Sequence, residues 1–230
     1  MTMPRSDVVI FRGAVLPLPG VDVRNVYHPQ GFRLPDAHLH GRFSDAGPRG
    51  IVLHDTVTGT ASSGFRALVE RAKPDGTNMR LGSAFLLGPD GVLCQIVPDL
   101  ADVTWHASGW SAWGVGLDVV SWVDPKLAPR SPLRRPRTAW APGGYLDYAE
   151  EQKRVLRAAV PLLCGILGVP FDCPREKDGK PALRGYGRGP VKGLAPGAFR
   201  GVAGHAQVSK VRWDGNVALD VLFGAGPVIA

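Results

Sequence analysis

GIVLHDTVTG, residues 50–59, is the stretch from which the fold of the chain can be worked out. A short, β-branched apolar run ends at His54 and then turns polar, as a buried strand does where it emerges at the edge of a sheet. FRGVAGH, residues 199–205, has a similar character and ends at His205. The sequence therefore predicts two strands that each deliver a histidine at their carboxyl end.

Further strand patterns follow the first of these strands. SAFLLGPDGVLCQIVP, residues 83–98, consists of two apolar runs around a GPDG turn, which predicts a β-hairpin. WGVGLDVVSW, residues 113–122, alternates well enough to be another strand and places Asp118 inside it. An acidic residue in an apolar strand calls for a partner or a function.

Two segments carry helical periodicity. GFRALVERAK, residues 64–73, is expected to be a short amphipathic helix with Ser62 and Ser63 as plausible N-caps. Residues 144–170 contain the longest helical pattern, which Pro161 should kink or split. Strands and helices that alternate around a hairpin predict an α/β domain with a mixed central β-sheet flanked by helices.

Long irregular connections complete the chain, which contains 30 Gly and 21 Pro. Residues 123–144 and 169–199 are rich in proline, glycine and basic residues and are expected to be loops. Residues 1–49 predict an N-terminal strand or hairpin and a long surface arm, packed on a domain formed by residues 50–230. A length of 230 residues is consistent with a single globular domain.

The composition is that of a soluble globular protein, with 44% hydrophobic and 20% charged residues. No apolar run is long enough for a membrane anchor, and MTMPRSDVVIFRG at the start lacks the features of a secretory signal, so we expect synthesis in the cytoplasm. Cys94, Cys164 and Cys173 lack CxxC spacing and are expected to be core residues, with at least one free thiol.

The chain carries a formal net charge of +7, which favours a polyanionic partner. Nucleic acid, a lipid surface and an anionic cell-wall polymer would all satisfy this charge. The basic and aromatic residues form no recognisable nucleic-acid-binding motif, and GYGRG lacks the flanking strand and helix of a dinucleotide site. We therefore expect no nucleic-acid partner, although a basic nucleic-acid-binding module stays open as a separate class.

GHAQVSKVRWDG, residues 204–215, contains the most suggestive set of polar residues. His205 and Asp214 flank two cations, Lys210 and Arg212. Catalytic zinc sites use three protein ligands, and two histidines with one carboxylate would make such a set with His54. Spacing alone does not establish a metal site, because a histidine at a strand end more often serves as an ordinary polar group.

Taken together, five blocks of sequence resemble one known family. IVLHDT, SAFLLGPDGVLCQIVPD, TWHASGW, WGVGLDVV and GHAQVSKVRWDG occur in the order of the motifs of type 2 N-acetylmuramoyl-L-alanine amidases. This zinc amidase family includes phage endolysins, cell-wall recycling amidases and peptidoglycan recognition proteins. The resemblance covers about residues 50–220 and implies the fold of that family.

The resemblance also implies roles for individual residues. It assigns Zn²⁺ to His54, His205 and Asp214. It places Arg212 at the position of a cation that polarises the scissile carbonyl, where lysine is usual, and leaves Lys210 as the alternative.

Four further positions match the family's motifs or depart from them. Asp118 matches a catalytic carboxylate that is usually glutamate, although a strand acid paired with a loop arginine is the structural alternative. Trp105 and His106 match a motif beside the substrate cleft, so the resemblance implies that they contact substrate or support the site and do not bind the metal. Ala84 stands before Phe85 where relatives often carry an aromatic residue or histidine, so the tyrosine of the endolysin subtype is not expected there.

The function implied by this resemblance is zinc-dependent hydrolysis of the amide bond between N-acetylmuramic acid and L-alanine. The first hypothesis is a phage-type endolysin or related lytic amidase, with peptidoglycan or muropeptides as partners. We expect a monomer that reaches the cell wall by a holin-like route or by lysis of the host cell. A non-catalytic muropeptide-binding protein of the same fold and a cytoplasmic muropeptide-recycling amidase are the alternatives.

Two other groups of residues have structural interpretations that need no catalytic role. His38 and His40 form an HxH pair without a nearby third ligand in the sequence, so we expect a surface pair. Trp105, Trp110, Trp113 and Trp122 are candidates for stacking on sugars or bases at a cleft, with core packing as the open alternative for two of the four.

Overall fold

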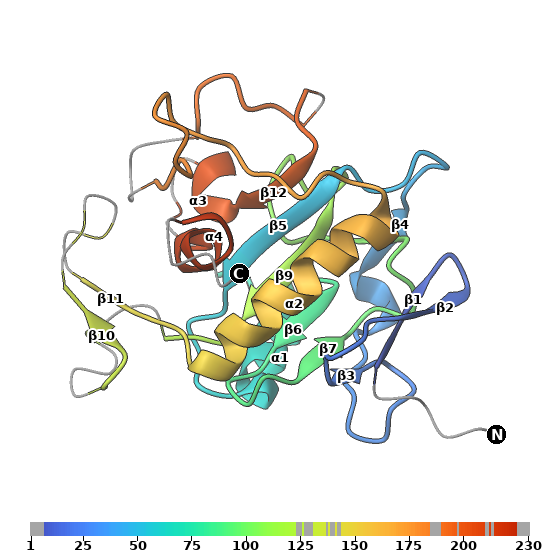
Figure 1. Ribbon diagram of the computed structural model, residues 1–230. Coiled ribbons are helices and arrows are strands. Elements are labelled where there is room, and N and C mark those ends of the chain that lie inside the picture. The colour runs from blue at the N-terminus through green and yellow to red at the C-terminus, as the bar shows by residue number, and fades with distance from the viewer. Residues whose placement is uncertain are drawn as a thin grey trace.

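A six-stranded mixed β-sheet forms the centre of the computed structural model (Figure 1). The structure describes residues 7–122, 126, 131–136, 138, 141, 144–184, 190–196, 198–209, 212 and 214–224. The strand order is β12-β5-β9-β6-β7-β3. The strands are β12 (Gly201–Gly204), β5 (Gly50–Asp55), β9 (Val115–Val119), β6 (Phe85–Leu87), β7 (Leu93–Gln95) and β3 (Val23–Arg24).

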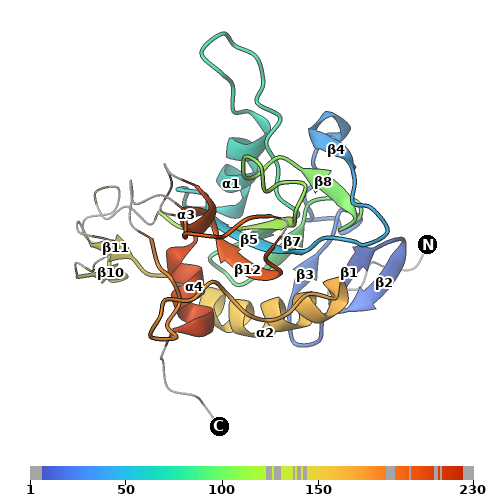
Figure 2. The same ribbon diagram turned by 90° about the horizontal axis from the view of Figure 1, so that it is seen from above.

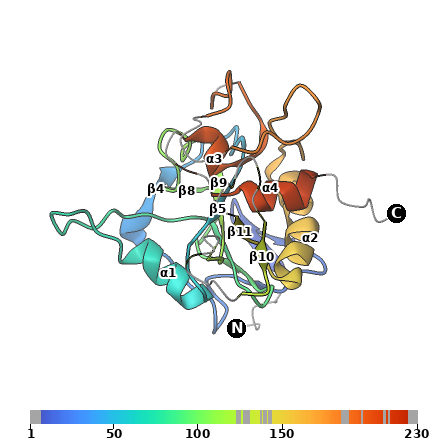
Figure 3. The same ribbon diagram turned by 90° about the vertical axis from the view of Figure 1, so that its left-hand side faces the viewer.

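Only one pairing in this sheet is antiparallel, the β6–β7 hairpin, and the other pairings among the described strands are parallel. The helix α1 (Ala61–Val69) lies on one face of the sheet, and α2 (Glu150–Leu167) and α4 (Asn216–Phe223) lie on the other (Figures 2 and 3). The expected mixed sheet flanked by helices is therefore confirmed.

The apolar runs of the central strands explain their place in the fold. All six residues of β5 and all five of β9 are buried. Ile51 and Leu53 belong to the core cluster that contains the apolar residues of α2, whereas Val52 packs with Ala107, Trp110 and Trp113, so both faces of β5 are buried and IVL does not alternate. The GPDG segment turns the chain between β6 and β7, as predicted.

The start of α1 corrects the prediction from the sequence, and α2 runs past its proline to a glycine. The N-cap of α1 is Thr60 and not Ser62 or Ser63: the Thr60 side chain accepts the Ser63 amide at 3.1 Å, and the Ser63 hydroxyl accepts the Thr60 amide at 3.1 Å. This reciprocal capping starts the helix earlier than its apolar face suggested. Pro161 lies inside α2 without splitting it, and Gly168 ends that helix in the left-handed conformation, with φ of 66°.

The N-terminal part of the chain contributes to several layers. β1 (Val8–Phe11) and β2 (Ala14–Pro17) form the expected hairpin, and β3 extends the central sheet. The 3₁₀ helix η1 (Asp36–His38) leads into β4 (Leu39–Arg42), which pairs with β8 (Asp102–Thr104). Residues of the expected arm thus contact the segment that precedes the Trp105–His106 motif.

Three further elements lie outside the central sheet. β10 (Arg134–Arg135) and β11 (Tyr145–Leu146) form a separate ladder, and α3 (His205–Val208) follows β12 directly.

Cys94, Cys164 and Cys173 are buried and free, as expected. Among the described residues, no helix combines the length and apolarity needed to cross a membrane.

Candidate metal centre

His54 and His205 meet because two parallel strands end side by side. β5 and β12 pair in register from Gly50–Gly201 to Leu53–Gly204; His54 is the next residue of β5, and His205 follows β12 as the first residue of α3. The two Nδ1 atoms lie 3.0 Å apart, and both side chains are buried. The parallel arrangement thus brings together two residues that are 151 positions apart in the chain.

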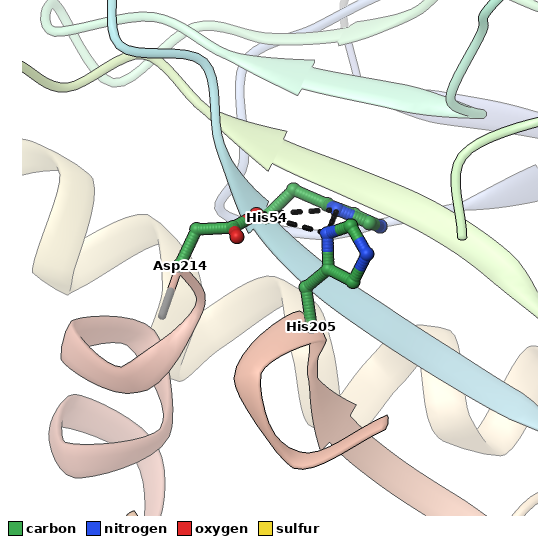
Figure 4. A group of neighbouring side chains, drawn as sticks. All are labelled: His54, His205 and Asp214. Atoms are coloured by element: carbon green, nitrogen blue, oxygen red, sulfur yellow. Dashed lines mark hydrogen bonds and ion pairs between the residues drawn. The ribbon is translucent and has the colours of Figure 1, made fainter. Parts of the chain in front are cut away.

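Asp214 completes a compact group of potential metal ligands (Figure 4). Its Oδ2 atom lies 3.1 Å from His205 Nδ1 and 3.5 Å from His54 Nδ1. The carboxylate is contributed by the turn that precedes α4, and only 8% of the residue's surface is exposed. Two imidazoles and one carboxylate therefore converge on one point.

The donor atoms fit a tetrahedral cation of the size of Zn²⁺. Ligand bonds of about 2.0–2.1 Å at tetrahedral angles put neighbouring donors about 3.3–3.4 Å apart. The three observed separations of 3.0, 3.1 and 3.5 Å lie around this value. Nitrogen and oxygen donors of this kind are those that zinc accepts in catalytic sites, where a fourth position is left for water.

Charges within the group perturb its titration. Burial opposes the charged form of His54, but the hydrogen bond and charge of Asp214, together with the charge of Asp118, raise its pKa overall. Burial and the neighbouring His54 lower the pKa of His205. Although burial alone would raise it, the hydrogen bonds from both histidines lower the pKa of Asp214. The centre therefore contains an ionised carboxylate that favours a bound cation.

The hydrogen bond to His106 determines which ring nitrogen of His54 keeps a lone pair for a metal. The Gly114 carbonyl can only accept, so His106 Nε2 carries a proton and donates it across 2.9 Å. Burial and the charge of His54 lower the pKa of His106 to about 3, so its ring is neutral and its Nδ1 is an acceptor. His54 Nε2, 3.0 Å from that atom, then donates. When His54 is neutral, this leaves the lone pair of its Nδ1 directed at the centre.

Asp118 lies beside His54 on the neighbouring strand, at the paired position in the β5–β9 register. Its carboxylate accepts a hydrogen bond from the Ser83 hydroxyl. This partner differs from the loop arginine of the structural alternative, and both residues are buried. Burial raises the pKa of Asp118 against the opposing effects of His54 and Ser83, which makes its ionised form a stronger base.

An open cavity gives access to this group. Its lining includes His54, Asp118, His205 and Asp214 and also contains Trp105 and Arg212. Arg212 is exposed, and Trp105 is 53% exposed. The structure thus brings the described members of the predicted site around one cavity, whereas Lys210 lies outside the described residues.

A wider hollow continues from the cavity along the Trp105–Ala112 segment and also includes Arg212 and Leu81 in its lining. Trp105 is held there by His40, whose ring stacks on it with centroids 4.3 Å apart and an interplanar angle of 12°. One face of the indole is therefore covered by protein. Trp110 and Trp113 are buried, which matches the core-packing alternative for two of the tryptophans.

The HxH pair is not the surface pair predicted from the sequence. His38 is buried, and its Nδ1 donates to the Leu81 carbonyl at 2.6 Å, while His40 packs on Trp105. The partners come from segments far along the chain, so the local sequence gave no sign of them. Both histidines connect β4 to the rim of the cavity.

Sequence reasoning also missed residues that support the centre. Asp55 follows His54 and accepts the Gly215 amide at 2.7 Å and the Tyr148 hydroxyl at 2.5 Å. Burial raises the pKa of Asp55 to about 7, against the effect of these two donors. An acid placed directly after the strand histidine was the one available signal for this role.

Comparison with known proteins gives a likeness of structure only. No family model matches the chain, and no curated protein matches it. The N-acetylmuramoyl-L-alanine amidase LysC from Clostridium intestinale URNW is similar at 14% identity, with 86% of this chain and 94% of that chain covered and a TM-score of 0.46. Drosophila PGRP-LB shows 14% identity, coverage of 90% and 98%, and a TM-score of 0.45.

The endolysin amidase LysCS from Clostridium intestinale URNW is similar at 16% identity, with coverage of 82% and 84% and a TM-score of 0.44. These structural neighbours are amidases and a peptidoglycan recognition protein, the classes that the sequence blocks resemble.

Proposed function

We propose that the chain is a zinc-dependent amidase that hydrolyses the bond between N-acetylmuramic acid and L-alanine in peptidoglycan, as a phage-type endolysin or related lytic enzyme. Residues 50–230 would form its catalytic domain, with residues 1–49 packed on it. The observation that carries the proposal is the convergence of His54 Nδ1, His205 Nδ1 and Asp214 Oδ2 at tetrahedral spacing beside an open cavity.

Zn²⁺ bound by these three residues would supply Lewis-acid chemistry, polarising the scissile carbonyl and making the attacking water more acidic. Asp118 is the residue that takes the proton of this water, because it lines the cavity and its pKa is raised by burial. Ser83 orients the carboxylate through its hydroxyl. The proton on Asp118 is then available to the leaving amine of L-alanine.

Arg212 stabilises the negative charge that develops on the carbonyl oxygen, since it lines the cavity beside His205 and Asp214. Lys210 is the alternative cation. The uncovered surface of Trp105 offers an apolar platform for the sugar of the substrate, next to the hollow that continues from the cavity. The amide specificity itself rests on the resemblance of the five sequence blocks to the amidase family.

Digestion of purified peptidoglycan tests this function. The zinc-loaded chain should release peptides with new L-alanine amino termini, detected by mass analysis and amino-terminal labelling. His205→Ala should abolish both zinc binding and release, whereas His28→Ala, a matched loss of a histidine outside the cavity lining, should change neither.

Other outcomes would exclude the proposal. New reducing sugar ends without new amino termini would identify a glycosidase. Binding to sacculi with no bond cleaved by a zinc-loaded chain would identify a non-catalytic binding protein. Cleavage of soluble muropeptides but not of sacculi would identify a recycling amidase in place of a lytic one.

A further inference from the structure

The turn that carries Asp214 is bonded to the residues that follow the two histidines. Asp55 comes directly after His54, and its Oδ2 accepts the Gly215 amide at 2.7 Å. Ala206 comes directly after His205, and its amide donates to the Asp214 carbonyl at 3.0 Å. The third ligand is therefore tied by hydrogen bonds to the strand end that delivers the first ligand and to the helix that begins with the second.

Asp55 engages both of its carboxylate oxygens in this arrangement. Oδ1 accepts the hydroxyl of Tyr148, which is fully buried just before α2. Asp55 and His54 both line the cavity, and the bonds of Asp55 connect the end of β5 to Tyr148 before α2 and to Gly215 before α4. A buried carboxylate with two donors is a rigid bridge, because neither donor can be exchanged for water without opening the core.

Gly215 makes this close approach possible. Its φ is 84°, and a Cβ at this position would lie 2.3 Å from the Leu53 carbonyl oxygen and 2.9 Å from Gly204 Cα. The peptide between Asp214 and α4 thus packs closely against β5 and β12, at the residues that precede the two histidines. Packing and hydrogen bonds together define where the Asp214 carboxylate can be.

We propose that Asp55 is a positioning residue of the metal centre, which fixes Asp214 against His54 and His205 through the Gly215 amide and the Tyr148 hydroxyl. This inference rests on the proposed zinc function. It assigns a role in metal affinity to a side chain that is not itself a ligand. Outer-shell partners of this kind typically contribute about 10–100-fold in metal affinity.

Zinc titration of the metal-free full chain with a competing chelator tests the proposal. Asp55→Ala should weaken zinc binding about 10–100-fold, and Tyr148→Phe, which removes one donor only, by a smaller factor. Asp55→Asn should stay within about threefold of the wild type, because an amide oxygen still accepts the Gly215 amide and the amide nitrogen can donate to Tyr148. The absorption spectrum of the Co²⁺-loaded protein should change for Asp55→Ala and return with Asp55→Asn.

Asp99→Ala is the matched control. Asp99 is also a buried carboxylate that accepts backbone amides, those of Arg12 at 2.7 Å and Gly13 at 2.9 Å, but it is outside the cavity lining. Its loss should lower the stability of the fold and leave zinc affinity unchanged. If Asp55→Ala fails to fold, the zinc affinity of Tyr148→Phe relative to that of the wild type tests the proposal in the same way.

Zinc affinity in Asp55→Ala equal to that of the wild type, or reduced no more than in Asp99→Ala, would overturn the role of Asp55 while leaving the proposed amidase intact. A wild-type chain that binds no zinc would overturn both. The expected loss of zinc affinity in a chain that cleaves no peptidoglycan would support the positioning role and reject the amidase.

Discussion

Replacing Gly215 by alanine should damage the metal centre far more than its small size suggests. Any residue other than glycine at φ of 84° is strained, which costs about 1–2 kcal/mol. The added Cβ would also lie 2.3 Å from the Leu53 carbonyl oxygen, in the strand that ends at His54. Relief of this contact requires the Asp214 turn to move away from β5, so we expect a total loss of about 3 kcal/mol or more.

Gly13→Ala separates the cost of the strained backbone from the cost of the steric contact. Gly13 has φ of 75°, and a Cβ there would meet nothing within 4 Å. It should cost only the conformational strain and leave the centre unaffected. Urea unfolding of the metal-free proteins measures stability, and competition with a chelator measures zinc affinity.

We expect Gly215→Ala to lose at least about tenfold in zinc affinity in addition to its stability, because the carboxylate moves relative to both imidazoles. Equal stability and equal zinc affinity for Gly215→Ala and Gly13→Ala would refute the reasoning. The two variants are expected to differ only because the added Cβ has no room at Gly215.

Three further predictions concern the residues around the cavity. Asp118→Asn should lower turnover on peptidoglycan about 10²–10⁴-fold while zinc affinity stays unchanged, because a general base and not a ligand is lost; an equal fall in zinc affinity would contradict this. Zinc affinity should fall about tenfold per pH unit below the raised pKa of His54 and level off above it, because the proton competes for the nitrogen that must bind the metal; a flat profile in chelator competition between about pH 5 and 8 would exclude this competition. Arg212→Ala should change unfolding free energy by less than about 0.5 kcal/mol, since the side chain is exposed, and lower turnover about 100-fold; full turnover would transfer the role to Lys210.

Much of the fold could be predicted because its decisive signals are local. The apolar run before His54, the GPDG hairpin and the strand around Asp118 all specify elements through neighbouring residues. The same logic failed for the start of α1, where the reciprocal bond between Thr60 and Ser63 outweighed the apolar pattern. It failed for His38 because its partner, the carbonyl of Leu81, is 43 residues away.

The sequence by itself determined which residue types could form a centre and where strands would deliver them. His54 and His205 followed from two apolar runs, and the order of the motifs proposed Asp214, Asp118 and Arg212. Only the tertiary structure decided that their atoms meet, because the pairing of β5 with β12 joins segments 151 residues apart.

The tertiary structure alone also revealed what supports that centre. The bond of His106 to His54 spans 52 residues, and the bond of Asp55 to Gly215 spans 160. Hydrogen bonds over such separations depend on the packing of whole elements, which no local pattern of the chain encodes. The ligands could therefore be proposed from the sequence, whereas their fixed geometry is a property of the folded sheet.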